Sequence, residues 1–196
     1  MNNDNLLSKN RKEYDFLNLS YNRFLDLYAE INSTNFIELS PELRFYKIKD
    51  IFGVYSELLS YKPIKDFIDE IKKHRPPMEA EISSAVLKFI RNVLVHFPFF
   101  KTWNEVYVTK KLINWTSEGK FIDKFLNKYL GHREVEYRFK YVGHKEFTYV
   151  TFSFPKEYKE NKIYLKDMIN EGDGIRFCLF LMYRVLMSQV ISITEK

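Results

Sequence analysis

Residues 88–98 read Lys88-Phe89-Ile90-Arg91-Asn92-Val93-Leu94-Val95-His96-Phe97-Pro98, and the rest of the chain is best interpreted outward from this stretch. On a helix of 3.6 residues per turn, its large apolar side chains fall on one broad arc, together with Ile82 and Val86 upstream. Such an arc is typical of a helix that faces a hydrophobic core. We therefore predict a helix from about Met78 to Phe97, which Pro98 ends because proline cannot continue it.

The opposite arc of this helix carries Arg91, Asn92 and His96, with Ala85 and Val95 between the polar groups. Apolar residues are unusual on a solvated face, so the pattern indicates that a partner covers it. Arg91 and His96 differ by about 7.5 Å in axial rise, a span that two long side chains can close on one phosphate. Arginine offers a permanently charged planar fork to phosphate oxygens, whereas histidine exchanges a proton near neutral pH.

On this helix, Arg91-Asn92-x-x-x-His96 resembles the RNxxxH form of the R-x(4–6)-H motif of the HEPN family. The following run, Phe97-Pro98-Phe99-Phe100-x-x-Trp103, is similar to bacterial defence-associated members of that family. The resemblance covers about residues 79–115. It implies a small α-helical bundle of the kind that includes metal-independent ribonucleases of toxin–antitoxin, abortive-infection and CRISPR systems.

The resemblance also implies roles for particular residues. Arg91, Asn92 and His96 are the expected catalytic residues: His96 moves the proton of the RNA 2′-hydroxyl or of the leaving oxygen, Arg91 holds the phosphate, and Asn92 orients the site. Lys88 and Lys101 are expected to contact the RNA. Two copies of the motif are expected to meet across a homodimer formed through this helix. No cofactor is expected, and an antitoxin or a phage-derived regulator is a further potential partner.

Two alternatives remain open on the sequence. A non-catalytic HEPN module that binds RNA, a nucleotide or a partner protein would keep the same motif. An ordinary helical interaction protein can carry an arginine and a histidine as a surface pair, and replacing Arg91 or His96 would then change neither toxicity nor binding.

Composition places further bounds on the chain. Its 196 residues suit one domain over 1–196 with a core of its own. The 31 basic and 26 acidic side chains give a net charge of +5, which is compatible with an acidic partner but does not require one. Local basic clusters at 9–12, 72–75 and 110–111 are candidates to flank a polyanion groove.

The cysteine and histidine content limits the chemistry. Cys178, the single cysteine, excludes an intramolecular disulfide, and its apolar neighbours predict a buried, inert thiol. The four histidines, at positions 74, 96, 132 and 144, lack metal-ligand spacing, so no metal site is expected. The start of the chain lacks the features of a signal peptide, and we expect a cytoplasmic protein.

The remaining pattern predicts a mainly α fold, a HEPN-like helical bundle with an added β-hairpin at about 135–154. Ser40-Pro41-Glu42 is a helix-start signal, and Pro63 is expected to end or interrupt the helix that follows. The apolar run at 177–187 could suggest a membrane span, but Arg176, Arg184 and Gln189 favour a helix at the centre of the bundle. Further helices are expected at about 6–31, 64–73, 121–129, 157–170 and 175–193, and short elements at 106–108 and 112–115.

Overall fold

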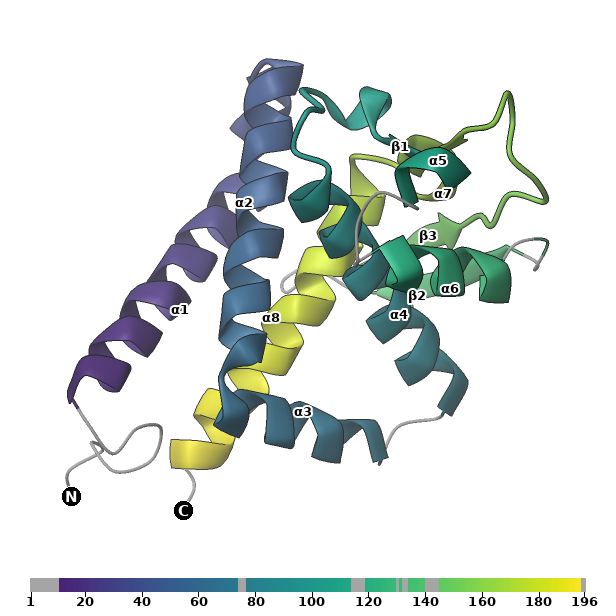
Figure 1. The fold of residues 1–196 in the computed structure, drawn as a ribbon. Helices are drawn as coiled ribbons and strands as arrows, with labels where there is room; N and C mark the ends of the chain where they lie inside the picture. Colours follow the sequence, from purple (N-terminus) through teal and green to yellow (C-terminus); the bar gives the residue numbers. More distant parts are fainter. Residues whose placement is uncertain are drawn as a thin grey trace.

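The computed structural model describes residues 11–73, 77–113, 119–129, 131, 134–139 and 145–194 (Figure 1). The long helices are α1 (Arg11–Asn32), α2 (Pro41–Ser60), α3 (Lys62–Lys73), α4 (Pro77–His96), α6 (Gly119–Tyr129) and α8 (Asp173–Thr194). The short elements are the 3-10 helices η2 (Thr34–Glu38) and η3 (Trp103–Glu105), the helices α5 (Lys110–Ile113) and α7 (Leu165–Met168), and the strands β1 (Tyr107–Val108), β2 (Val135–Phe139), β3 (Thr148–Phe152) and β4 (Ile163–Tyr164).

Helices dominate the packing. α1 lies along α2, and α8 contacts α1, α3, α4 and strand β3 (Figure 1). α4 contacts α2, α3, α6 and α8, so the helix that carries the motif runs through the centre of the bundle. The prediction of a mainly α fold with an added β-hairpin is confirmed.

The start of α2 follows the sequence signal closely. The Ser40 hydroxyl accepts a hydrogen bond from the backbone N–H of Leu43 at 3.3 Å, and Pro41 occupies the first helical position. This cap satisfies one of the N–H groups that have no partner within the helix. Pro63 does not interrupt α2, which ends at Ser60; it lies in the first turn of α3, where its missing N–H costs nothing.

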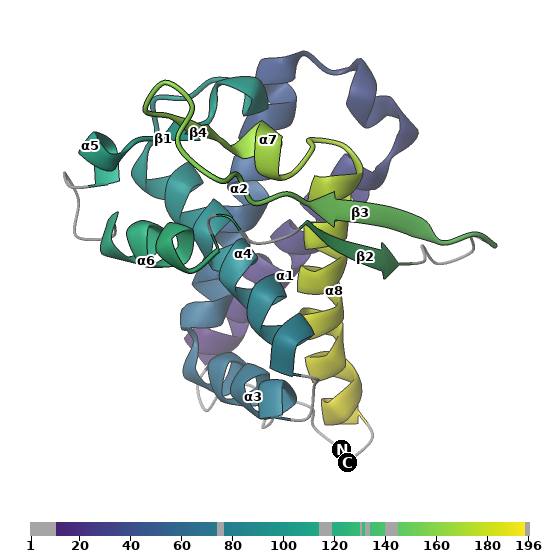
Figure 2. The same cartoon turned by 90° about the vertical axis from the view of Figure 1, so that its right-hand side faces the viewer.

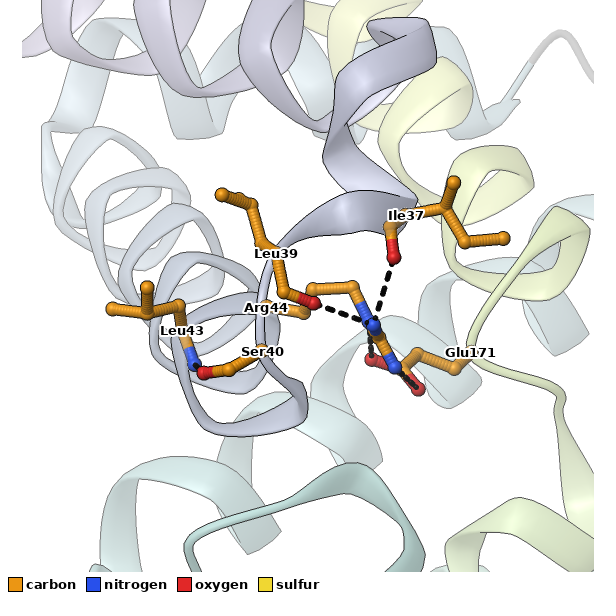
Figure 3. Close-up of polar contacts among 6 residues, drawn as sticks. All are labelled: Ile37, Leu39, Ser40, Leu43, Arg44 and Glu171. Carbon is orange, nitrogen blue, oxygen red and sulfur yellow. Dashed lines mark hydrogen bonds and ion pairs between the residues drawn. The ribbon is translucent and has the colours of Figure 1, made fainter.

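Arg44 ties this end of α2 to the turn before α8 (Figure 3). Its Nε donates to Glu171 Oε1 at 3.0 Å, and its Nη1 donates to the carbonyls of Ile37 at 3.2 Å and Leu39 at 2.8 Å. One guanidinium therefore joins η2, α2 and the α7–α8 turn.

α8 is a core helix, as predicted. Its buried side chains include Phe177, Cys178, Leu179, Met182 and Leu186. Burial raises the pKa of the Cys178 thiol, in keeping with the expected inert cysteine. Within the part of the chain that the structure describes, no helix has the length and apolarity needed to cross a bilayer.

The predicted hairpin is present as an antiparallel pair, β2 with β3, in which Val135 lies opposite Phe152 and Phe139 opposite Thr148. Val150 and Phe152 are buried against the bundle, and β3 packs on α8. The hairpin projects from the side of the bundle (Figure 2). Between the two strands, residues 140–144 lie outside the described residues.

The expected helix over 157–170 is wrong for most of its length. Glu160 and Asn161 have φ values of 49° and 66°, in the left-handed region, and Lys159 and Lys162 exchange backbone hydrogen bonds across them. This tight turn redirects the chain into β4, which pairs with β1. Only Leu165–Met168 is helical, because two consecutive left-handed residues are incompatible with a continuous α-helix.

The other predicted helices are confirmed within a few residues of their expected ends. Residues 6–10 of the first one lie outside the described residues. Gly131, two residues after the end of α6, has a φ of 75°, which glycine adopts without strain. In the segment expected to hold short elements, Tyr107–Val108 forms a strand and Lys110–Ile113 a helical turn, whereas residues 114 and 115 lie outside the described part.

Candidate functional site

The core face of α4 fixes the position of the motif. Val86, Phe89, Ile90, Val93, Leu94 and Phe97 are all buried, as the sequence predicts. The side chain of Ile82 lies outside the described part. Phe89 stacks on Phe125 of α6 with ring centroids 4.3 Å apart, which holds the motif helix against α6. The rotation of α4 about its axis is therefore set by the core.

His96 is the last residue of α4. The backbone N–H of Phe97 still bonds to the carbonyl of Val93 at 3.2 Å, but Pro98 has no N–H and disfavours helical geometry before it. The helix end therefore lies directly after the motif. This position leaves the His96 ring half-buried at the rim of the bundle.

The three motif side chains meet at one guanidinium nitrogen. Arg91 Nη1 donates to Asn92 Oδ1 at 3.0 Å and lies 3.5 Å from His96 Nε2. Because arginine has no acceptor, the second contact is a hydrogen bond only when Nε2 is unprotonated and the ring proton is on Nδ1. At 3.5 Å it is at the long limit for a hydrogen bond and thus weak.

Arg91 is only half-buried, yet part of its charge lacks a partner. Its Nε atom is buried without a hydrogen-bond partner, and no described side chain supplies a carboxylate to its guanidinium. A buried N–H donor without a partner costs about 1–3 kcal/mol. A guanidinium without a carboxylate partner is suited to an anionic ligand, because phosphate oxygens would neutralise its charge and accept from its accessible N–H groups.

Asn92 is buried by the chain itself and not by a partner protein. The sequence predicts a face covered by a partner, but Asn92 is 4% exposed within the single chain, since α4 is enclosed by α2, α3, α6 and α8. It is the one buried polar side chain among the described residues. The Asn92 amide oxygen therefore has a defined position, and the hydrogen bond that it accepts from Nη1 orients the Arg91 guanidinium.

The two lysines expected to bind RNA lie in different settings. Lys88 is exposed, one helical turn before Arg91, and its Nζ lies 4.4 Å from the centroid of the Phe121 ring on α6. Lys101 is exposed beyond the end of α4, and no contact joins it to the motif. The pKa of Glu42 is lowered, mainly by a backbone hydrogen bond and the Ser40 side chain, and also by the charge of Lys101. Lys101 thus lies toward the start of α2.

The basic clusters are only partly described. Residues 9–10 and 74–75 lie outside the described part, as do the side chains of Arg11, Lys12 and Lys72. Lys110 lies on α5, with its Nζ 5.6 Å from the Tyr158 ring centroid. Among the described residues, no group of three or more histidine, cysteine or carboxylate side chains is arranged to hold a metal ion.

Tyrosines and lysines also combine on a surface that the sequence pattern does not predict, which we call the tyrosine–lysine ribbon. It consists of Tyr107, Lys162, Tyr164 and Lys166, at β1, β4 and α7. The helix expected over 157–170 would not pair with 107–108 and would not bring these rings together. The signal that could have found it is the Lys159-Glu160-Asn161-Lys162 run, whose asparagine tolerates left-handed geometry.

No protein-family model, curated protein or solved structure matches this chain. The likeness stated above therefore rests on the motif helix and the segment that follows it.

Proposed function

We propose that the chain is a metal-independent endoribonuclease of the HEPN type, which cleaves RNA by attack of the 2′-hydroxyl on the adjacent phosphate. In this proposal it acts as a toxin or abortive-infection effector in antiphage defence. The single observation that carries the proposal is the Arg91 guanidinium, half-buried beside His96 without a carboxylate partner among the described residues.

Arg91 would bind the scissile phosphate. Charge-assisted hydrogen bonds are about twice as strong as neutral ones, so phosphate oxygens compete well against the weak 3.5 Å contact of Arg91 Nη1 with His96 Nε2. Turning toward the phosphate frees Nε2 of His96. It also brings the unpartnered Nε–H of Arg91 to an acceptor, and it places positive charge where negative charge develops.

His96 would move the protons. Its free ring nitrogen accepts the proton of the 2′-hydroxyl as that oxygen attacks phosphorus, and the bond from phosphorus to the 5′-oxygen breaks. An imidazolium gives a proton to this leaving oxygen. The products are a 2′,3′-cyclic phosphate and a 5′-hydroxyl, and DNA is not cut because it lacks the nucleophile. Acid–base assistance of this kind is worth roughly 10²–10⁴ in rate.

A homodimer through α4 fits this division of labour. One imidazole cannot be an unprotonated base and a protonated acid at the same moment. Two copies of His96 at one cleft supply both forms, and two copies of Arg91 supply two cations to one phosphate. Asn92 would keep each Arg91 within reach of that phosphate.

Growth after induced expression, together with RNA-end profiling, tests the proposal. The wild type should arrest growth and leave cyclic-phosphate RNA ends, whereas Arg91→Ala and His96→Ala should do neither while keeping a wild-type circular dichroism spectrum. Arg91→Lys keeps a positive charge but loses the planar guanidinium. Its growth arrest and its yield of cyclic-phosphate ends should lie between those of the wild type and of Arg91→Ala. Arg23→Ala, which removes an exposed arginine paired with Asp50 between α1 and α2, is the matched control and should behave as wild type.

Cleavage by the purified protein should persist in EDTA. Loss of cleavage in EDTA by a folded protein would contradict the mechanism. RNA, nucleotide or partner binding without cleavage under varied conditions would instead support the non-catalytic alternative. Identical behaviour of all variants would assign the motif to structure alone.

A further inference from the structure

The tyrosine–lysine ribbon combines rings and charges at short range. Lys162 Nζ lies 4.6 Å from the ring centroid of Tyr107 and 6.0 Å from that of Tyr164, and Lys166 Nζ lies 5.2 Å from the Tyr164 centroid. The rings of Tyr107 and Tyr164 lie side by side on the β1–β4 pair, with centroids 5.7 Å apart and planes tilted by 57°. Both tyrosines of the ribbon are half-buried, so each keeps part of its side chain accessible.

The ribbon has a rigid base. Tyr107 pairs with Tyr164, and the next pair, Val108 with Ile163, is buried, so the two faces of β1–β4 differ in polarity. The backbone N–H of Leu165 donates to the Val106 carbonyl at 3.0 Å. Rings on such a base lose little freedom when a ligand stacks on them, because their backbone is already fixed.

A series of rings connects the ribbon to the motif. Phe97, the residue after His96, has its ring centroid 6.1 Å from that of Phe99, which is 54% exposed. Phe99 lies 4.4 Å from Phe100, and Phe100 lies 5.3 Å from Tyr107. Figure 2 shows β1 and β4 at the end of the molecule toward which α4 rises. Phe97 and Phe100 are buried, so this series fixes the ribbon close to the end of α4, and Phe99 is its exposed ring between the two.

Alternating rings and ammonium groups suit one ligand class best. The unpaired bases of single-stranded RNA stack on aromatic side chains while lysines meet its phosphates. An exposed cation–π contact is weaker than base–aromatic stacking, so a base can displace an ammonium from a ring face, and the ammonium can then turn to the neighbouring phosphate. A duplex keeps its bases paired and offers the rings nothing to stack on.

We propose that the tyrosine–lysine ribbon binds single-stranded RNA and directs it to Arg91 and His96. This inference rests on the proposed ribonuclease function for its substrate. It adds a binding surface formed at β1, β4 and α7, whose two lysines lie more than 60 residues after the motif.

The test measures RNA affinity in a protein that cannot cleave by the proposed mechanism. In the His96→Ala background, fluorescence anisotropy gives the Kd for a labelled single-stranded RNA of about 12 nucleotides, within the range of known single-strand sites. Tyr164→Leu removes the ring while keeping apolar bulk, and should raise Kd about tenfold. Tyr164→Phe keeps the ring and should leave Kd unchanged. Circular dichroism and thermal unfolding check the fold of each variant.

A lysine variant and controls complete the test. Lys162→Gln should raise Kd and lower the slope of log Kd against log salt by about 0.7. Tyr149→Leu, on the exposed face of the hairpin, and Lys65→Gln, on α3, should bind as the parent does. An RNA duplex of equal length should bind about tenfold more weakly than the single strand.

The two proposals fail in different ways. Equal Kd values for Tyr164→Leu and Tyr164→Phe, equal affinity for duplex and single strand, or no RNA binding by the parent would each overturn the ribbon proposal, even if the protein with His96 intact cleaves RNA. Ribbon-dependent binding of single strands by a protein that never cleaves would uphold RNA binding by the ribbon, but it would refute the ribonuclease and with it the delivery of the strand to Arg91 and His96 for cleavage.

Discussion

Asn92 is the most buried of the three motif residues, and replacing its amide by a carboxylate tests the role of the Arg91 charge. It is buried and accepts a hydrogen bond from Arg91 Nη1 at 3.0 Å. Aspartate has the same shape but carries a charge, so it would form an ion pair with Arg91 in the same place. The fold should survive, because the new carboxylate already has its cation.

Asn92→Asp should therefore reduce RNA cleavage at least tenfold, since Arg91 would no longer have uncompensated charge for a phosphate; a charged hydrogen bond is worth about 1.5–3 kcal/mol. Single-turnover cleavage rates and thermal unfolding would separate this effect from misfolding. Asn104→Asp, at an exposed position in η3, is the control. Wild-type cleavage by a folded Asn92→Asp protein would mean that the charge of Arg91 is not used.

Tyr21 on α1 supplies a second prediction for a single side chain. Its hydroxyl is buried without a hydrogen-bond partner among the described residues, and desolvation raises its pKa from 10.0 to about 12. Tyr21→Phe removes the unsatisfied group, so the free energy of unfolding at pH 7 should stay equal or rise by about 1 kcal/mol.

The pH dependence should differ as well. The native state holds the Tyr21 proton more tightly than the unfolded state does. The stability that depends on the protonated Tyr21 hydroxyl is therefore complete below pH 10 and is lost as pH rises toward 12. Urea unfolding of both proteins from pH 8 to 11.5 should give wild-type stability that falls by up to about 2 kcal/mol more than that of Tyr21→Phe. Parallel profiles would contradict the assignment to Tyr21.

Among the described glycines, Gly119 at the start of α6 has the closest backbone neighbour. A Cβ atom built on Gly119 would lie 1.7 Å from the carbonyl oxygen of Ile113 in α5, whereas one on Gly53, in the middle of α2, would meet nothing within 4 Å. The two glycines therefore form a matched pair.

Gly119→Ala should destabilise the protein by several kcal/mol, because backbone must move to admit the methyl group. Gly53→Ala should stabilise it by about 0.5–1 kcal/mol, because alanine favours an open helix interior. Chemical denaturation of both variants measures the difference. A neutral Gly119→Ala would show that α5 and α6 can separate at little cost.

Features that depend on neighbouring residues are predicted correctly from the sequence, whereas features that depend on contacts between distant residues are not. The start of α2 was predictable because Ser40, Pro41 and Glu42 act within one turn, and α8 because its apolar run is long. Asn92 was assigned to a polar arc by periodicity, yet α6 and its neighbours, distant in sequence, bury it. The pairing of β1 with β4 was equally hidden, because it joins residues more than fifty positions apart. Motif spacing predicted which side chains could meet, but not which donor of Arg91 would lack a partner.

For the whole molecule, the Arg44–Glu171 contact joins segments that are distant in the chain (Figure 3). Its side chains are 19% and 21% exposed, so solvent screens the ion pair only in part. Arg44→Met would leave the Glu171 carboxylate and the carbonyls of Ile37 and Leu39 without this donor.

Arg44→Met should lower the free energy of unfolding by about 2–3 kcal/mol and Tm by roughly 5–10 °C. Glu171→Gln keeps a hydrogen-bond acceptor for Arg44 and should cost less than half as much. Calorimetry of the two variants gives the comparison. If both substitutions proved equally mild, the link between α2 and the α7–α8 turn would be dispensable for stability.

The position of α8 has a consequence for how the protein is made. Helices α1, α3 and α4 and strand β3 all pack on α8, which the ribosome synthesises after them. Until residues 173–194 emerge, the apolar faces that these elements turn toward α8 stay uncovered, although α1 and α4 already pack on α2, and the nascent chain is exposed to aggregation and to chaperones. The fold, and any activity that depends on it, is thus withheld until translation of α8 is complete.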